Sequence, residues 1–187
     1  MESICHHVFG FILRNDLIGL QTVLKKNPDA LEYNDRFSNT PLLYACYCGR
    51  SQIVSYLLAL GANHQRINVF GQNALTLATY SGNIETCNMI LAHFDFNEFN
   101  STGILSPLCV ATLQGNTAIA KFYLTLEMPT ENPFDCSSES IHGVCPMQLA
   151  HFKGDINMIN LLRPRHQLHM LKNTTNSLRP YHPNRIQ

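Results

Sequence analysis

The chain has 187 residues, enough for one domain, and 45% of them are apolar whereas 14% are charged. This composition can bury a core and excludes a chain that is disordered throughout. The net charge is zero, but residues 1–162 carry eight Lys or Arg against thirteen Asp or Glu, whereas residues 163–187 carry five basic residues and no acid. No apolar run approaches the length of a membrane span, and no secretory signal is visible at the N-terminus.

Two helices are predicted at the start of the chain. The first covers about residues 4–13, and the second runs from Arg14 towards Pro28, where the proline marks its end. The pair matches the later part of the chain only loosely. We expect such an atypical unit at the end of a repeat array, where it acts as a cap.

The next part of the chain repeats one pattern four times. The four segments are Thr40–Gly49, Asn73–Gly82, Ser106–Gly115 and Cys145–Gly154. Each opens on a capping residue, has an alanine at its sixth position and ends on glycine, and these alanines recur after 33, 33 and 39 residues. A fixed period of this length is the signature of a solenoid, in which each unit packs on its neighbours. Each segment is predicted to be a short helix that ends at its glycine.

A second helix is predicted after each glycine. Ile53, Val54, Leu57 and Leu58 lie on one helical face, and the later units keep part of this pattern. Links rich in Asp, Asn, Ser and Gly join the units at residues 35–39, 68–72 and 140–144, where we expect tight turns. Residues 127–139 hold two prolines and four acids and lengthen the last period, so they are predicted to form a protruding loop.

This arrangement resembles the ankyrin-repeat family over residues 4–162. The five repeats would be residues 4–34, 35–67, 68–100, 101–139 and 140–162, followed by a basic capping segment and flexible tail at 163–187. The resemblance implies an all-α solenoid of helix–turn–helix units with β-hairpin finger loops. It also implies that the first helices line a concave face, that the second helices form the convex back, and that the usual role is protein–protein recognition.

The resemblance implies which positions of each repeat contact a partner. The residue two places before each closing glycine faces the concave surface in the family, and the residue three places before each helix start lies at a finger tip. The predicted partner-binding residues are Phe37, Tyr47, Phe70, Tyr80, Leu113, His142 and Phe152. Aromatic residues in phase favour a binding surface. The alternative is that these rings only cover neighbouring helices and complete the core.

Other chemistry finds little support in the sequence. Cys136, His142, Cys145 and His151 match no standard zinc-ligand spacing, and no phosphate-binding glycine loop or nucleophile signature is present. We therefore predict no metal, no cofactor and no enzymatic activity. Cys46, Cys87 and Cys109 fall at core positions, which fits free thiols in a reducing compartment, either the cytoplasm, the nucleus or the cytoplasm of a host cell.

The predicted function is a non-enzymatic adaptor that binds another protein on the concave face. The alternative is a regulatory or inhibitory subunit that blocks a partner enzyme through its finger tips and the 127–139 loop around Phe134, and a pathogen effector acting on host proteins would be one such case. The basic tail offers a weaker route to nucleic acid or acidic lipid, since its five charges are sparse. A small-molecule substrate is not expected.

Overall fold

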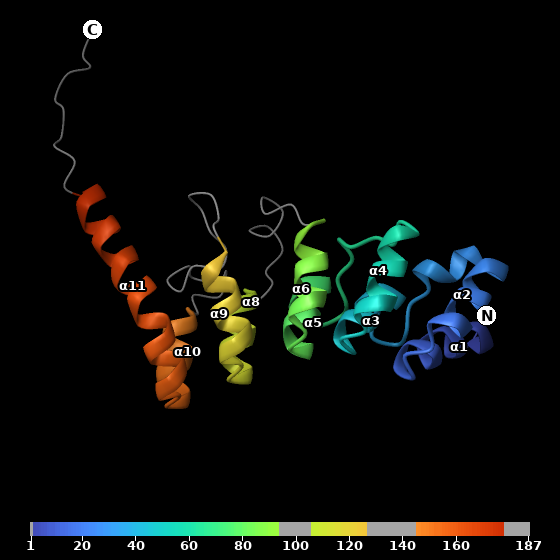
Figure 1. Ribbon diagram of the computed structural model, residues 1–187, viewed down its shortest axis with the longest axis horizontal. Coiled ribbons are helices and arrows are strands. Elements are labelled where there is room, and N and C mark those ends of the chain that lie inside the picture. The colour runs from blue at the N-terminus through green and yellow to red at the C-terminus, as the bar shows by residue number, and fades with distance from the viewer. Residues whose placement is uncertain (1, 94–105, 127–144, 178–187) are drawn as a thin grey trace, which may run out of the picture.

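The computed structural model describes residues 2–93, 106–126 and 145–177. Ten α-helices in these ranges pair into five helix–turn–helix units, which stand side by side along one axis with α1 and α11 at opposite ends (Figure 1). The first helices are α1 (Glu2–Leu13), α3 (Pro41–Tyr47), α5 (Ala74–Ser81), α8 (Pro107–Gln114) and α10 (Pro146–Lys153). The second helices are α2 (Leu17–Lys26), α4 (Ser51–Ala59), α6 (Ile84–Leu91), α9 (Thr117–Thr125) and α11 (Ile156–Ser177), and a 3-10 helix, η1 (Pro28–Glu32), follows α2.

The first helices form one continuous layer. Helix α1 packs against α3, α3 against α5, α5 against α8, and α8 against α10. Each second helix packs on the first helix of its own unit, and α4 also contacts α6. The all-α solenoid predicted from the period is therefore confirmed. No helix in the described ranges is both long enough and apolar enough to cross a membrane.

Polar side chains begin the first helices of the repeated units. Thr40, Asn73 and Ser106 each accept a hydrogen bond from the backbone N–H three residues further on. In the last unit the Cys145 sulfur takes this role, accepting from the Gln148 N–H, while the Gln148 side chain accepts from the Cys145 N–H. The helix starts at Asn73 and Cys145 are therefore capped like the others, because each residue presents an acceptor.

Left-handed residues end the first helices and set the phase of the array. Gly82 has φ 76° and is followed by Asn83, whose side chain caps α6. Asn15 has φ 58° and is followed by Asp16, whose carboxylate caps α2 in the same way. Asn15 therefore occupies in the first unit the place that glycine holds in the later ones, as the tolerance of Asn for this conformation allows.

The core runs through the stacked units and contains free thiols. Cys46, Cys87 and Cys109 are fully buried, as predicted. Burial raises the pKa of Cys46 and raises the pKa of Cys109 to about 11, so both thiols stay protonated at neutral pH. The buried Tyr123 hydroxyl and the Thr79 hydroxyl share a hydrogen bond, which ties α9 to α5 across the stack.

The finger loops differ from the β-hairpins that the resemblance implied. No residue in the described ranges belongs to a β-strand; the fingers at 35–39 and 68–72 are tight turns. In each finger the first residue's N–H donates to the fifth residue's carbonyl, from Asp35 to Asn39 and from Asn68 to Gln72. The side chains of Asp35 and Asn68 take up further backbone amides within these turns. With these amides engaged locally, a strand ladder does not form.

The C-terminal boundary also differs in its local structure. The sequence suggested a last repeat ending near Leu162, followed by a separate basic capping segment and flexible tail at 163–187. Instead, α11 continues through both regions as one helix from Ile156 to Ser177, with Pro164 inside it. A proline within a helix removes one N–H donor, here the bond to the carbonyl four residues earlier, and the helix continues on both sides of that gap.

Candidate functional site

The predicted concave positions lie exposed on successive first helices. Tyr47, Tyr80 and Leu113 are each close to half exposed, and Phe152 is 91% exposed. They project from α3, α5, α8 and α10, which pack in that order. The four residues therefore line up along one face of the array. Large apolar side chains in phase on one face are typical of an interaction surface rather than of scattered surface residues.

The first unit contributes a fifth member that the sequence reasoning missed. Leu13 is the last residue of α1, is 55% exposed, and precedes the left-handed Asn15 by two places. Tyr47 stands in the same relation to Gly49. The signal was present in the sequence as Asn15-Asp16, a left-handed residue followed by a helix cap. We call the five residues Leu13, Tyr47, Tyr80, Leu113 and Phe152 the concave row.

Aromatic rings form two short chains, and one of them includes two members of the concave row. Tyr47 stacks on Tyr80 with ring centroids 5.5 Å apart, and the finger-tip rings of Phe37 and Phe70 lie 5.6 Å apart. Tyr44 continues the first chain towards α1, with its ring 6.3 Å from that of Tyr47. Because Tyr47 remains 48% and Tyr80 46% exposed despite their contact, the rings do more than finish the core. Their outer faces are open to a partner.

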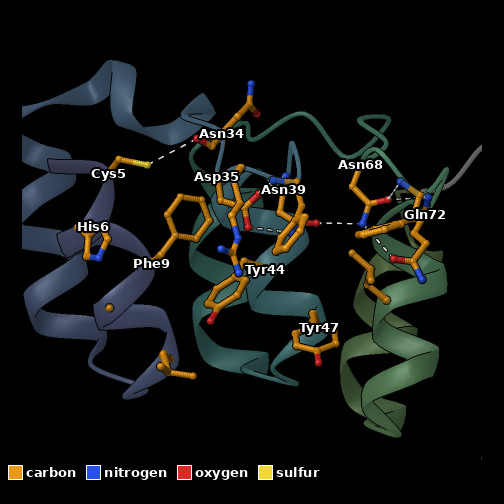
Figure 2. A pocket seen from close by; sticks show the side chains of 16 residues that line it. Cys5, His6, Phe9, Asn34, Asp35, Asn39, Tyr44, Tyr47, Asn68 and Gln72 are labelled. Carbon is orange, nitrogen blue, oxygen red and sulfur yellow. Dashed lines mark hydrogen bonds between the residues drawn. The ribbon is translucent and has the colours of Figure 1, made fainter. Parts of the chain in front are cut away.

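A groove of about 1040 Å³ separates the finger tips from the first helices (Figure 2). It is lined by Phe9 from α1, by Tyr44 and Tyr47 from α3, and by Phe37 and Phe70 from the fingers. The Phe9 ring meets the Tyr44 ring edge to face at 5.2 Å. Three of these five rings, those of Phe37, Tyr47 and Phe70, were predicted from the sequence. Phe9 and Tyr44 fall outside the two positions that this prediction used, although both reach the groove.

A ladder of polar side chains fixes the finger wall (Figure 2). The Asn39 amide donates to the Asp35 carboxylate at 2.9 Å, and the Asn68 amide donates to Asn39 Oδ1 and to the Gln72 side-chain oxygen, each at 3.0 Å. The Val69 N–H also donates to the Phe37 carbonyl, which joins one finger to the next. Phe37 and Phe70 are therefore presented from a braced wall, and little ordering is needed when a partner binds.

The groove has few charged residues, and only the positive charge of Arg36 is not paired within the described residues. The Asp35 carboxylate accepts from two backbone amides and one side-chain amide, so its negative charge is already engaged. The Arg36 guanidinium lies over the Phe37 ring at 4.6 Å, and no ion pair joins it to another described residue. Two other polar residues near the predicted positions are already engaged: Gln72 joins the ladder, and Lys153 donates to the Leu113 carbonyl.

Among the residues considered for metal binding or nucleophilic chemistry, those that the structure describes have structural roles or lie on the surface. Cys145 caps α10, and His151 is exposed on the same helix. Cys136, His142 and the loop at 127–139 with Phe134 lie outside the described residues. Within the described ranges, no three His, Cys, Asp or Glu side chains gather as metal ligands would. At Cys5, which lines the groove, burial and then the nearby Asp35 raise the pKa, so the thiol is held protonated.

Comparison with known proteins settles the family. The model of ankyrin repeats matches residues 12–102 as three copies. A DNA replication inhibitor named plutonium, from Drosophila melanogaster, is 33% identical over 156 residues, which span 81% of this chain and 86% of the relative. The chain belongs to the ankyrin-repeat family. Its five helix pairs extend the array beyond the three copies that the family model matches.

Two further relatives share only a small part of their length with this ankyrin-repeat protein. The chain is 33% identical over 122 residues to the protein fem-1 homolog A-like of Mus musculus, across 62% of this chain and 18% of the relative. It is 34% identical over 86 residues to the target of rapamycin complex 2 subunit AVO2 of Saccharomyces cerevisiae, across 44% of this chain and 20% of the relative. These likenesses are consistent with a role in protein interaction.

Proposed function

We propose that this ankyrin-repeat protein is a non-enzymatic regulatory subunit that binds another protein along its concave face. The observation that carries the proposal is the concave row, in which all five units present an exposed apolar side chain in phase. Large, rigid side chains gathered in one patch are the usual anchors of an interface, because they bury area at a small entropic cost.

A role in restraining DNA replication is the regulatory function that we favour. The relative named a DNA replication inhibitor aligns with most of both chains, so the likeness extends beyond a shared repeat motif. The feature of the described residues that suits such a role is the concave row, an exposed apolar surface of the kind that binds proteins. We therefore infer that any such effect passes through a bound protein in a reducing compartment, either the nucleus or the cytoplasm.

The proposal is tested by affinity capture with a quadruple variant, in which Phe37, Tyr47, Phe70 and Tyr80 are each replaced by alanine. The matched control replaces four exposed apolar residues of the second-helix layer, namely Ile18, Leu60, Ile84 and Ile156, by alanine. Both variants lose four exposed apolar side chains, so non-specific hydrophobic binding is reduced in each. Wild type and variants are expressed in dividing cells, and captured proteins are identified by mass spectrometry alongside incorporation of a labelled thymidine analogue.

We expect one or more proteins to be captured by wild type and by the control but lost with the quadruple variant. We also expect wild type and control to lower thymidine-analogue incorporation, and the quadruple variant to leave it unchanged. Identical captures by all three proteins would contradict the concave face as the binding surface. Loss of the captured protein with no difference in DNA synthesis would contradict the replication role and leave the binding role standing.

A further inference from the structure

We propose that the groove between the finger tips and the first helices binds a proline-rich segment in the polyproline II conformation, and that this segment carries a carboxylate. The inference rests on the proposed function and adds the chemistry of the partner segment. It follows from three features of the groove, which are its occupied backbone amides, its aromatic walls and its single uncompensated cation.

The occupied amides argue against a partner that adds a β-strand. In the finger wall, the backbone N–H groups of residues 35, 37–39 and 68–72 all donate within the protein. The opposite wall is made of helices, whose amides are engaged in their own turns. Strand addition depends on a free edge of backbone donors and acceptors. The groove offers side chains and almost no backbone donors, so recognition must come from rings, hydroxyls and charge.

The aromatic walls favour a polyproline segment over a helix. Five aromatic rings line the groove, those of Phe9, Phe37, Tyr44, Tyr47 and Phe70, and flat rings of this kind accommodate pyrrolidine rings. The Tyr47 hydroxyl makes no hydrogen bond to any other described residue and can donate to a peptide carbonyl. The carbonyls of a polyproline II segment have no internal partners, whereas those of a helix are already engaged.

The positive charge of Arg36 in the groove favours a partner segment that carries a carboxylate. Arg36 lines the groove and forms no ion pair within the described residues, while the one acid of the lining, Asp35, is engaged by its own finger. The Arg36 guanidinium lies over the Phe37 ring at 4.6 Å from its centre and is exposed, so an acid that enters the groove can pair with it. An acidic segment therefore gains a contact that a neutral or basic segment lacks, so the charge of the occupant decides between them.

The test is selection from a phage-displayed library of random dodecapeptides against the full chain. Phage retained by wild type are counter-selected on a Tyr47→Ala/Phe70→Ala variant, and the peptides that survive are made with a fluorescein label for titration. We expect these peptides to be enriched in proline and in Asp or Glu. Arg36→Gln should weaken their binding by about tenfold or more, because a hydrogen-bonded charge contact is lost, whereas Arg66→Gln, an exposed cation outside the groove lining, should not.

The outcomes separate this inference from the proposed function. Tyr47→Phe keeps the ring and removes the hydroxyl, and we expect it to weaken the selected peptides by about threefold to tenfold. Selected peptides that carry apolar residues at helical spacing, or lysine and arginine in place of acids, would overturn the inference while the groove remains a protein-binding site. A selection that yields no groove-dependent peptide would also overturn it. Loss of the captured cellular protein in the quadruple variant would then still support the proposed function.

Discussion

Replacing both Tyr47 and Tyr80 by alanine is expected to weaken binding of the captured partner by about 100-fold or more. The two rings stack at 5.5 Å in the middle of the concave row, and each keeps close to half its surface open. Truncation of one aromatic anchor at an interface centre costs about 2 kcal/mol or more. Because the rings touch, we expect their effects to be non-additive. Calorimetric titration of the purified partner into each single variant and the double variant measures the loss of affinity and its non-additivity.

The control for the double variant is Ile18→Ala/Ile84→Ala in the second-helix layer. Both isoleucines are exposed, so this pair removes a similar apolar area from the opposite layer. We expect its affinity to stay within about twofold of wild type, since near-neutral surface changes of this size are usual. Urea unfolding should give nearly the same free energy for all the proteins. Equal losses of affinity in the two double variants would contradict the assignment of the face.

Leu75→Ala is expected to lower the free energy of unfolding by about 2–5 kcal/mol. Leu75 is fully buried in α5, which packs against α3, α6 and α8. A cavity there weakens the unit's own core and its contacts with both neighbouring units. Since a solenoid is held together by interfaces between adjacent units, damage at the centre affects both halves. Urea unfolding followed by circular dichroism at the helix band measures the loss.

A matched control exists in the same layer of helices. Leu113→Ala makes the same chemical change at an exposed position of α8 in the concave row. We expect its cost to stability to remain below about 1 kcal/mol, because little area is withdrawn from water there. Similar destabilisation by the two substitutions would mean that Leu113 belongs to the core. The concave row would then lose one of its members.

The fold was predictable because the repeated glycines fix the phase. Once Gly49, Gly82, Gly115 and Gly154 are aligned, the helix starts, the buried cysteines and the exposed positions two residues earlier all follow. The array of helix pairs and the exposure of Tyr47 and Tyr80 were accordingly correct. What no pattern could supply was contact between units. That Phe9 of the first unit meets Tyr44 of the second depends on how α1 packs on α3.

The remaining errors have local physical causes. Leu13 was missed because Asn15 takes the left-handed conformation that glycine takes elsewhere, so the first unit looked out of phase. The fingers were expected to be β-hairpins, but the side chains of Asp35 and Asn68 draw the nearby amides into closed turns. A boundary between the last repeat and a separate C-terminal segment was expected after Leu162, yet α11 runs as one helix from Ile156 to Ser177. None of these local differences changes the arrangement of the helix pairs in the solenoid.

The most direct test of the concave face is site-specific photo-crosslinking in cells. A photoreactive phenylalanine analogue is placed singly at Tyr47, Tyr80 or Phe152 on the concave row, and at Ile18 or Ile84 on the second-helix layer. We predict that the concave positions crosslink to a common partner and that the second-helix positions do not. Crosslinks to that partner from Ile18 or Ile84, with none from the concave row, would contradict the account.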